Sequence, residues 1–256
     1  MTNGWRLTGL LSVLLGAMCL AFLIPHGWDI EGLRLVVRST ARTSLVLFAF
    51  AFSASALYFL APNAATRWQR RNRRYLGVSF AVSHALHLAA LIVLIRLDPA
   101  LFWTLTNPFN IAFSSVAYLA IALMTVTSFD TTAAWLGPRK WQALHRFGGW
   151  YILLIFAGGT GKRLMEGPIY WAMFSFVLAI AAVRLIAMSR RGRRTAAAAG
   201  AAGTAVTEEG MKCSVEKTPP SSRPRPPGWG GVSCTVEPAF RPRRCITPGR
   251  NAPTTT

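Results

Sequence analysis

The feature that most constrains this chain is a series of apolar blocks, each roughly as long as a helix that crosses a lipid bilayer. The blocks are mostly Leu, Ala, Val, Ile and Phe, and they lie near residues 7–24, 43–61, 75–95, 111–129, 143–157 and 169–188. A helix needs about 20 apolar residues to cross ~30 Å of hydrocarbon. Unbroken apolar runs also disfavour a β-barrel, whose strands alternate. The sequence therefore predicts an all-α membrane protein, a six-transmembrane-helix bundle over residues 1–194.

The composition agrees with a membrane protein. Hydrophobic residues make up 52% of the chain and charged residues only 14%, whereas a soluble domain is typically about 25% charged. The first block follows Arg6, but it is too long for a secretory signal and lacks a small-residue cleavage site, so we expect a retained helix.

The basic segments predict an orientation. The segment "RWQRRNRR" (67–74) has five arginines and no acid, and "GPRKW" (137–141) and "RRGRR" (190–194) are also basic. Because cytoplasmic loops carry the Lys/Arg excess, we expect both termini in the cytoplasm. The segments then expected on the external side are 25–42, 96–110 and 158–168.

The net charge of +19 comes from these loops and from the C-terminal tail. We expect no nucleic-acid partner, because that would need a folded basic face. Residues 195–256 are low in complexity and then rich in Pro, Arg and Gly, which predicts a disordered tail. Cys213, Cys234 and Cys245 fall in this tail, and no spacing of theirs predicts a metal site or a disulfide framework.

Histidines inside the apolar blocks are the main functional signal. The stretch "SHALHL" (83–88) places His84 and His87 three residues apart, on one face of a helix. His145 opens the fifth block. An ionisable residue in a span usually marks a cofactor, ion or proton path, although a hydrogen bond to a neighbouring helix is the alternative for any single histidine.

Imidazoles on two facing helices are the arrangement that bis-histidine ligation of a haem iron requires. Zinc is less favoured, because no carboxylate lies in the third or fifth block to complete four ligands. Arg38 and Arg42 precede the second block. They could pair with Asp29 or Glu31 or hold a haem propionate, and Arg42 is the better placed for the second task.

Several spaced motifs resemble a known family. They are "RRYLG" (73–77), His87, "TS" (127–128), "LGPRKWQALHR" (136–146) and "ARTSL" (41–45). In this order they resemble the ferric-reductase-like transmembrane domain, closest to the branch that contains the haem-binding membrane subunit of the bacterial methionine-sulfoxide reductase system. The resemblance covers roughly residues 35–160.

The resemblance implies a six-helix bundle in the inner or plasma membrane of a bacterium that holds haem b and passes electrons across the membrane. It implies that His87 and His145 are ligands of the haem iron. The family has a further histidine thirteen residues after the position of His145, where this chain has Gly158. One haem is therefore expected rather than two, and His84 is a candidate to compensate.

The choice between the two histidines of the third block stays open. By the helical rise, His84 lies about 15 Å past Arg74 and is closer to His145 in depth. His87 is the match by motif.

We expect the electron donor to be a separate flavoprotein, a flavin or a quinone, because no GxGxxG follows a strand. The acceptor is an unknown external molecule, and the sequence leaves open whether the chain alone is an oxidoreductase. One alternative is a redox-inactive membrane scaffold or partner subunit of the same fold, which Gly158 favours. A proton-coupled transporter is a third, but no internal repeat supports it.

Overall fold

The structure, a computed structural model, describes residues 4–26 and 28–215. The elements are α1 (Trp5–Leu23), α2 (Ile30–Leu60), α3 (Ala64–Leu97), α4 (Pro99–Leu105), α5 (Pro108–Val126), α6 (Asp130–Leu136), α7 (Pro138–Gly161), the 3₁₀ turn η1 (Leu164–Glu166) and α8 (Pro168–Val215). No strand occurs within these residues, so the all-α prediction is confirmed.

Long apolar helices support a multi-pass integral membrane protein in contact with lipid. Among the described residues, five helices are long and apolar enough to cross a membrane: α1, α2, α3, α5 and the Pro168–Gly200 part of α8. Helix α7 coincides with the predicted fifth span and has 24 residues. Its glycines and Arg146 make the most apolar stretch of α7 less apolar than those of the other long helices, and α7 is not among these five. Within the described residues, length and composition therefore support five membrane spans and not the predicted six.

Two helices begin well before the spans predicted for them. Residues 30–42 and 67–74 were predicted as loops, but they belong to α2 and α3. The Asp29 side chain accepts a hydrogen bond from the backbone N–H of Gly32 at 2.8 Å, which caps α2. Asn63 and Thr66 form a capping box that begins α3. Apolarity locates the membrane-crossing part of a helix, whereas caps locate its ends.

The prediction of a disordered tail from residue 195 is wrong for residues 195–215, which continue α8. This stretch contains "TAAAAGAAGTA", and alanine has the highest helix propensity. The rest of the predicted tail, with Cys234 and Cys245, lies outside the described residues. Contacts group Met1–Thr204 as one unit, so this unit extends past the predicted boundary at residue 194.

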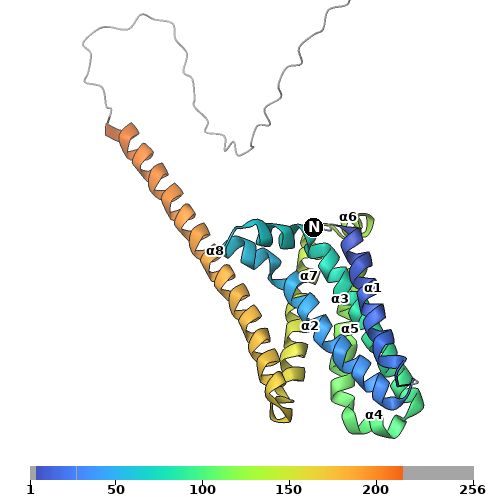
Figure 1. Cartoon of the computed structure of the whole chain (residues 1–256). Coiled ribbons are helices and arrows are strands. Elements are labelled where there is room, and N and C mark those ends of the chain that lie inside the picture. The colour runs from blue at the N-terminus through green and yellow to red at the C-terminus, as the bar shows by residue number, and fades with distance from the viewer. Residues whose placement is uncertain (1–3, 27, 216–256) are drawn as a thin grey trace, which may run out of the picture. The chain divides into compact units, whose positions relative to one another are not determined.

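Within the first unit, α1, α2 and α3 pack side by side (Figure 1). The turn between α1 and α2 lies at the same end as α4, while α6 lies at the end where α1 begins. Small polar residues line the α2–α3 contact, where the fully buried Ser44 hydroxyl donates to Ser83 at 2.9 Å. Such residues let membrane helices approach closely.

The main hydrophobic core packs α2 against four other helices, α3, α5, α7 and α8. Its buried members are Leu45, Phe48, Ala49 and Phe52 of α2, Phe80 of α3, Ile121 of α5, Ile152 and Leu153 of α7, and Val177 and Ile180 of α8. Phe52 is buried in this core. It stacks on Phe48 at 5.1 Å and meets Trp150 edge to face at 5.5 Å between ring centroids.

Helix α7 reaches this core through a glycine. A Cβ added at Gly149 would lie 2.9 Å from Cε2 of Phe52, whereas one added at Gly158 would meet nothing within 4 Å. The absence of a side chain at position 149 is therefore what lets α7 approach α2.

We expect Gly149→Ala to lower the thermal unfolding midpoint in detergent, because Phe48 and Trp150 leave the Phe52 ring little room to move. Overpacking of this kind costs about 1–3 kcal/mol. Gly158→Ala is the matched control on the same helix and should leave the midpoint unchanged or raise it, since alanine favours helix by up to about 1 kcal/mol. Equal midpoints for the two variants would contradict this close approach.

Candidate functional site

The histidines of α3 form a pair. The rings of His84 and His87 lie 5.5 Å apart between centroids, close to parallel, so the predicted shared face is confirmed. His84 also lies 5.1 Å from the ring of Tyr118 on α5 and 6.0 Å from that of Phe156 on α7. His84 therefore lies between α3, α5 and α7.

A contact with α2 fixes the orientation of His87. Its Nδ1 lies 3.0 Å from the carbonyl oxygen of Val37 and 3.1 Å from Oγ1 of Thr40. Thr40 donates its own hydroxyl hydrogen to the Val36 carbonyl at 2.6 Å. Because a carbonyl can only accept, we assign the proton of His87 to Nδ1, and Nε2 keeps its lone pair. A histidine that binds a metal is usually held in this way.

His84 has an unmet hydrogen-bonding group. Its Nδ1 is buried and has no hydrogen-bond partner, and its ring is surrounded by aromatic rings, including Phe80 at 5.2 Å. A buried polar atom left unpaired costs about 1–3 kcal/mol. Since His84 and His87 extend from the same side of one helix, they do not face each other as an opposed pair.

His145 belongs to a second group, at the start of α7. Its Nε2 lies 3.2 Å from Oγ1 of Thr127, the residue that ends α5. That hydroxyl donates to the carbonyl of Leu123 at 2.7 Å, so we assign the proton to Nε2 of His145, and Nδ1 keeps its lone pair. The ring also stacks on Trp141 at 4.2 Å between centroids.

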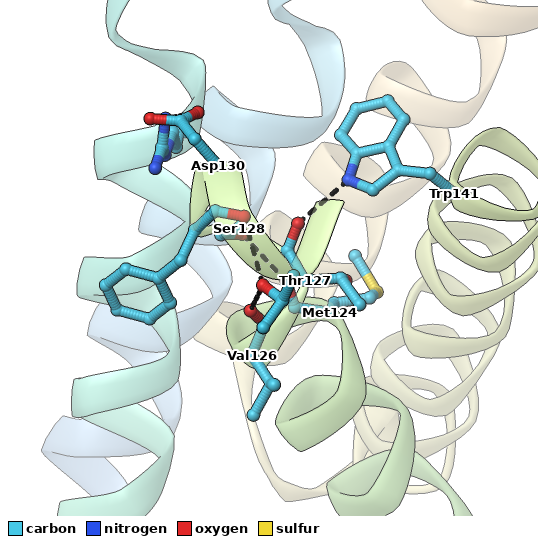
Figure 2. Close-up of polar contacts among 9 residues, drawn as sticks. Met124, Val126, Thr127, Ser128, Asp130 and Trp141 are labelled. Carbon is cyan, nitrogen blue, oxygen red and sulfur yellow. Dashed lines mark hydrogen bonds and ion pairs between the residues drawn. The ribbon is translucent and has the colours of Figure 1, made fainter. Parts of the chain in front are cut away.

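The turn between α5 and α6 holds this second group together (Figure 2). Trp141 donates from Nε1 to the backbone carbonyl of Thr127 at 2.9 Å, and Ser128 donates to the carbonyl of Met124 at 2.7 Å. Figure 2 shows Trp141 reaching across to the Thr127 carbonyl from outside the turn. The contacts fix the depth of His145 relative to α5.

His145 lines a cavity of about 690 Å³, within the range of about 300–1,000 Å³ for small-molecule sites. Its apolar wall includes Phe48, Phe52, Phe80 and Ile152. Among the described residues, seven arginines also line it: Arg70, Arg71, Arg73, Arg74, Arg146, Arg184 and Arg191. Neither His84 nor His87 contributes to this lining.

The structure does not bring His145 together with the α3 pair. On α5, the contact of His84 is Tyr118 and that of His145 is Thr127, nine residues apart, or about 13 Å at 1.5 Å per residue. On α7, Phe156 contacts His84 and lies eleven residues from His145, or about 16 Å. Two imidazole nitrogens on opposite sides of one metal ion are only about 4 Å apart, twice a bond of ~2 Å.

The remaining predicted residues lie apart from both histidine groups. Arg42 is exposed on α2 and makes no hydrogen bond, ion pair or ring contact within the described residues. Of the acidic partners considered for Arg38, Glu31 instead pairs with Arg34 at 2.7 Å. The described part of the chain also holds no group of three or more His, Cys, Asp or Glu residues suited to a metal ion.

Comparison with known proteins gives no relative. The chain matches no family model, and a search of curated proteins finds no match. The resemblance to the ferric-reductase-like domain therefore rests on the spaced motifs.

The Trp141–Thr127 contact can be tested by removing the indole N–H. We expect Trp141→Phe to lower the thermal unfolding midpoint, because the lost hydrogen bond is worth about 1 kcal/mol. The control is Trp135→Phe, since Trp135 is 88% exposed. If both variants melt like the wild type, the contact does not stabilise the α5–α7 arrangement.

Proposed function

We propose that the chain is a membrane haem b electron-transfer subunit, resembling ferric reductases, that passes electrons across the membrane to an external acceptor. The observation that carries the proposal is the anchored imidazole of His87. A buried histidine whose Nδ1–H is held by the Val37 carbonyl presents Nε2 as a ligand nitrogen. Helical bundles build cofactor sites from such inward-facing side chains.

The residues present suit a haem by the chemistry of their donors. Haem supplies reversible one-electron transfer at its iron. The imidazoles of His87, His84 and His145 would be candidate ligands of the iron, and aromatic rings pack around His84. The arginines beside His145 offer charge partners for propionates. Arg42 remains a candidate for the same task at the external end.

The spacing of the histidines defines how each would act. Because His145 and the α3 pair lie about 13–16 Å apart along the bundle, we assign them to separate levels, so that a haem at either level would have one imidazole ligand. A single histidine ligand suffices for haem in globins and peroxidases. His87, with its fixed tautomer, is the better candidate at its level, and His84 is the alternative.

The basic end of the bundle supports an orientation in the membrane. By the positive-inside rule, we expect the end with residues 67–74 and 137–141 to face the cytoplasm, together with both termini. A cytoplasmic donor, either a separate flavoprotein, a flavin or a quinone, would then deliver electrons near His145. The α3 pair lies farther toward the external end.

A redox-inactive membrane scaffold of the same fold is the second candidate. It is favoured by the hydrogen bonds that His87 and His145 make to Thr40 and Thr127, since these link neighbouring helices without any cofactor. The open space at Gly158, where the family has a histidine, agrees with this alternative.

Absorbance spectra of detergent-purified protein from haem-replete cells distinguish the two candidates. We expect a Soret band and, after dithionite reduction, the single broad visible band of haem with one imidazole ligand. If the haem lies at the level of His145, His145→Ala should weaken both bands, because it removes the imidazole there. If it lies at the level of the α3 pair, His87→Ala or His84→Ala should weaken them.

The control is His26→Ala. His26 is exposed, and its Nδ1 lies 2.9 Å from the carbonyl of Phe22 on its own turn, so its loss should leave the spectrum unchanged. A wild-type preparation with no Soret band would overturn the haem proposal and favour the scaffold.

A further inference from the structure

The cavity beside His145 gathers more positive charge than the described residues neutralise. Asp130 is the one carboxylate among its described lining residues, and it is already paired with Arg74 at 2.8 Å. Nε of Arg74 is itself buried without a hydrogen-bond partner. The other arginines of the lining have no carboxylate against them in the described chain.

Three of these arginines are held by neutral acceptors at the end of α2. Arg73 donates to Oγ of Ser55 at 2.9 Å, and Arg191 donates to the Ser55 carbonyl at 3.0 Å. Arg184 donates to the Phe52 carbonyl, and its guanidinium carbon lies 4.1 Å from the centroid of the Phe52 ring. The contacts fix the guanidinium groups around one space but leave their charges uncompensated.

Like charges held close together at the edge of a low-dielectric interior repel one another. Arginine does not relieve this repulsion by losing its proton, because the guanidinium group stays charged at neutral pH. The hydrogen bonds to Ser55 and Phe52 hold Arg73 and Arg184 in place beside the exposed Arg191. An anion seated among Arg73, Arg184 and Arg191 would remove the repulsion and use their free donors.

The chemistry of the lining residues indicates which kind of anion the cavity would bind. The guanidinium fork matches the oxygens of a phosphate. Beside the arginines the wall is apolar, with Phe48, Phe52 and Ile121. The cavity therefore combines a positively charged region with an apolar region. It also lies where long apolar helices turn polar, which is the depth of lipid headgroups, and basic pockets between membrane helices bind anionic headgroups.

We propose that this cavity binds the phosphate of an anionic glycerophospholipid, with the headgroup between Arg73, Arg184 and Arg191 and the start of the acyl chains along the phenylalanine wall. Because His145 also lines this cavity, a haem at that level and a lipid headgroup among these arginines would exclude one another. The inference therefore concerns the haem-free chain.

The test is thermal unfolding of the full chain, purified haem-free in a non-ionic detergent and titrated with phosphatidylglycerol, phosphatidylcholine or inorganic phosphate. We expect phosphatidylglycerol to raise the midpoint by several degrees, at roughly tenfold lower concentration than phosphatidylcholine. Inorganic phosphate should give no rise, because it lacks the apolar part.

Matched variants locate the effect. Arg73→Gln/Arg184→Gln should lose the rise with phosphatidylglycerol. Arg190→Gln/Arg193→Gln removes the same charge from exposed positions outside the lining and should keep it. Should the first variant fail to fold, Arg191→Gln takes its place, since that side chain is exposed and donates to the Ser55 carbonyl. Lipid retained by each variant, counted by native mass spectrometry, gives a second measure.

Four results would each overturn the proposal: no rise with phosphatidylglycerol, an equal rise with phosphatidylcholine, an equal rise with inorganic phosphate, or an equal loss in the two double variants. The third would assign the cavity to a soluble phosphate, and the fourth to general surface charge. Because the readout is lipid-dependent stability of haem-free protein, a failure here leaves the absorbance test of the proposed function unaffected.

Discussion

Close packing of α2 against α3 is the constraint on which the candidate site depends. Thr40, Ser44 and Ser83 are fully buried at this contact, and their small side chains bring the two backbones near enough for hydrogen bonds between the helices. The carbonyl of Val37 then reaches Nδ1 of His87 at 3.0 Å. A larger residue at position 40 or 83 would separate the helices and release the imidazole. The orientation of the His87 imidazole therefore depends on uncharged residues at the α2–α3 contact.

The same bundle separates its functional groups by depth. The α3 histidines lie among aromatic rings, whereas His145 lies at a cavity lined by arginines and is tied to the α5–α6 turn. A charged cavity is tolerable only near an end of the helices, where water and lipid headgroups lower the cost of charge. Uncharged imidazoles are the groups that the middle of the bundle can hold at lower cost. Histidines at different positions along the helices therefore have different surroundings: aromatic rings around His84, and arginines around His145.

Much of the fold follows from the sequence, because apolarity over about 20 residues has few structural solutions. Five of the six spans could be predicted this way, and helical periodicity predicts the shared face of His84 and His87. The starts of α2 and α3 could also be found from Asp29 and Asn63 as N-caps, although a hydropathy argument overlooks them. The alanine-rich start of the predicted tail likewise carried a helix signal that its low complexity concealed.

The candidate site was less predictable. Sequence distance gave a depth for each histidine along its own helix, but not which residues face it from α5 and α7. Only the contacts with Tyr118, Thr127 and Phe156 show that His145 and the α3 pair lie at separate levels. The arginine cavity was missed for a similar reason. Only the folded chain brings Arg184 and Arg191 close to Arg73. In the sequence, the basic segments 67–74 and 190–194 are already accounted for by the positive-inside rule.

Electron paramagnetic resonance of the oxidised, haem-loaded protein tests the central claim most directly, because the ferric spin state reports how many strong ligands the iron has. One imidazole per iron predicts a high-spin ferric signal. Opposed imidazoles from α3 and α7 would instead give a low-spin signal. A low-spin signal that His145→Ala and an α3 histidine variant each abolish would contradict the separation of the two levels.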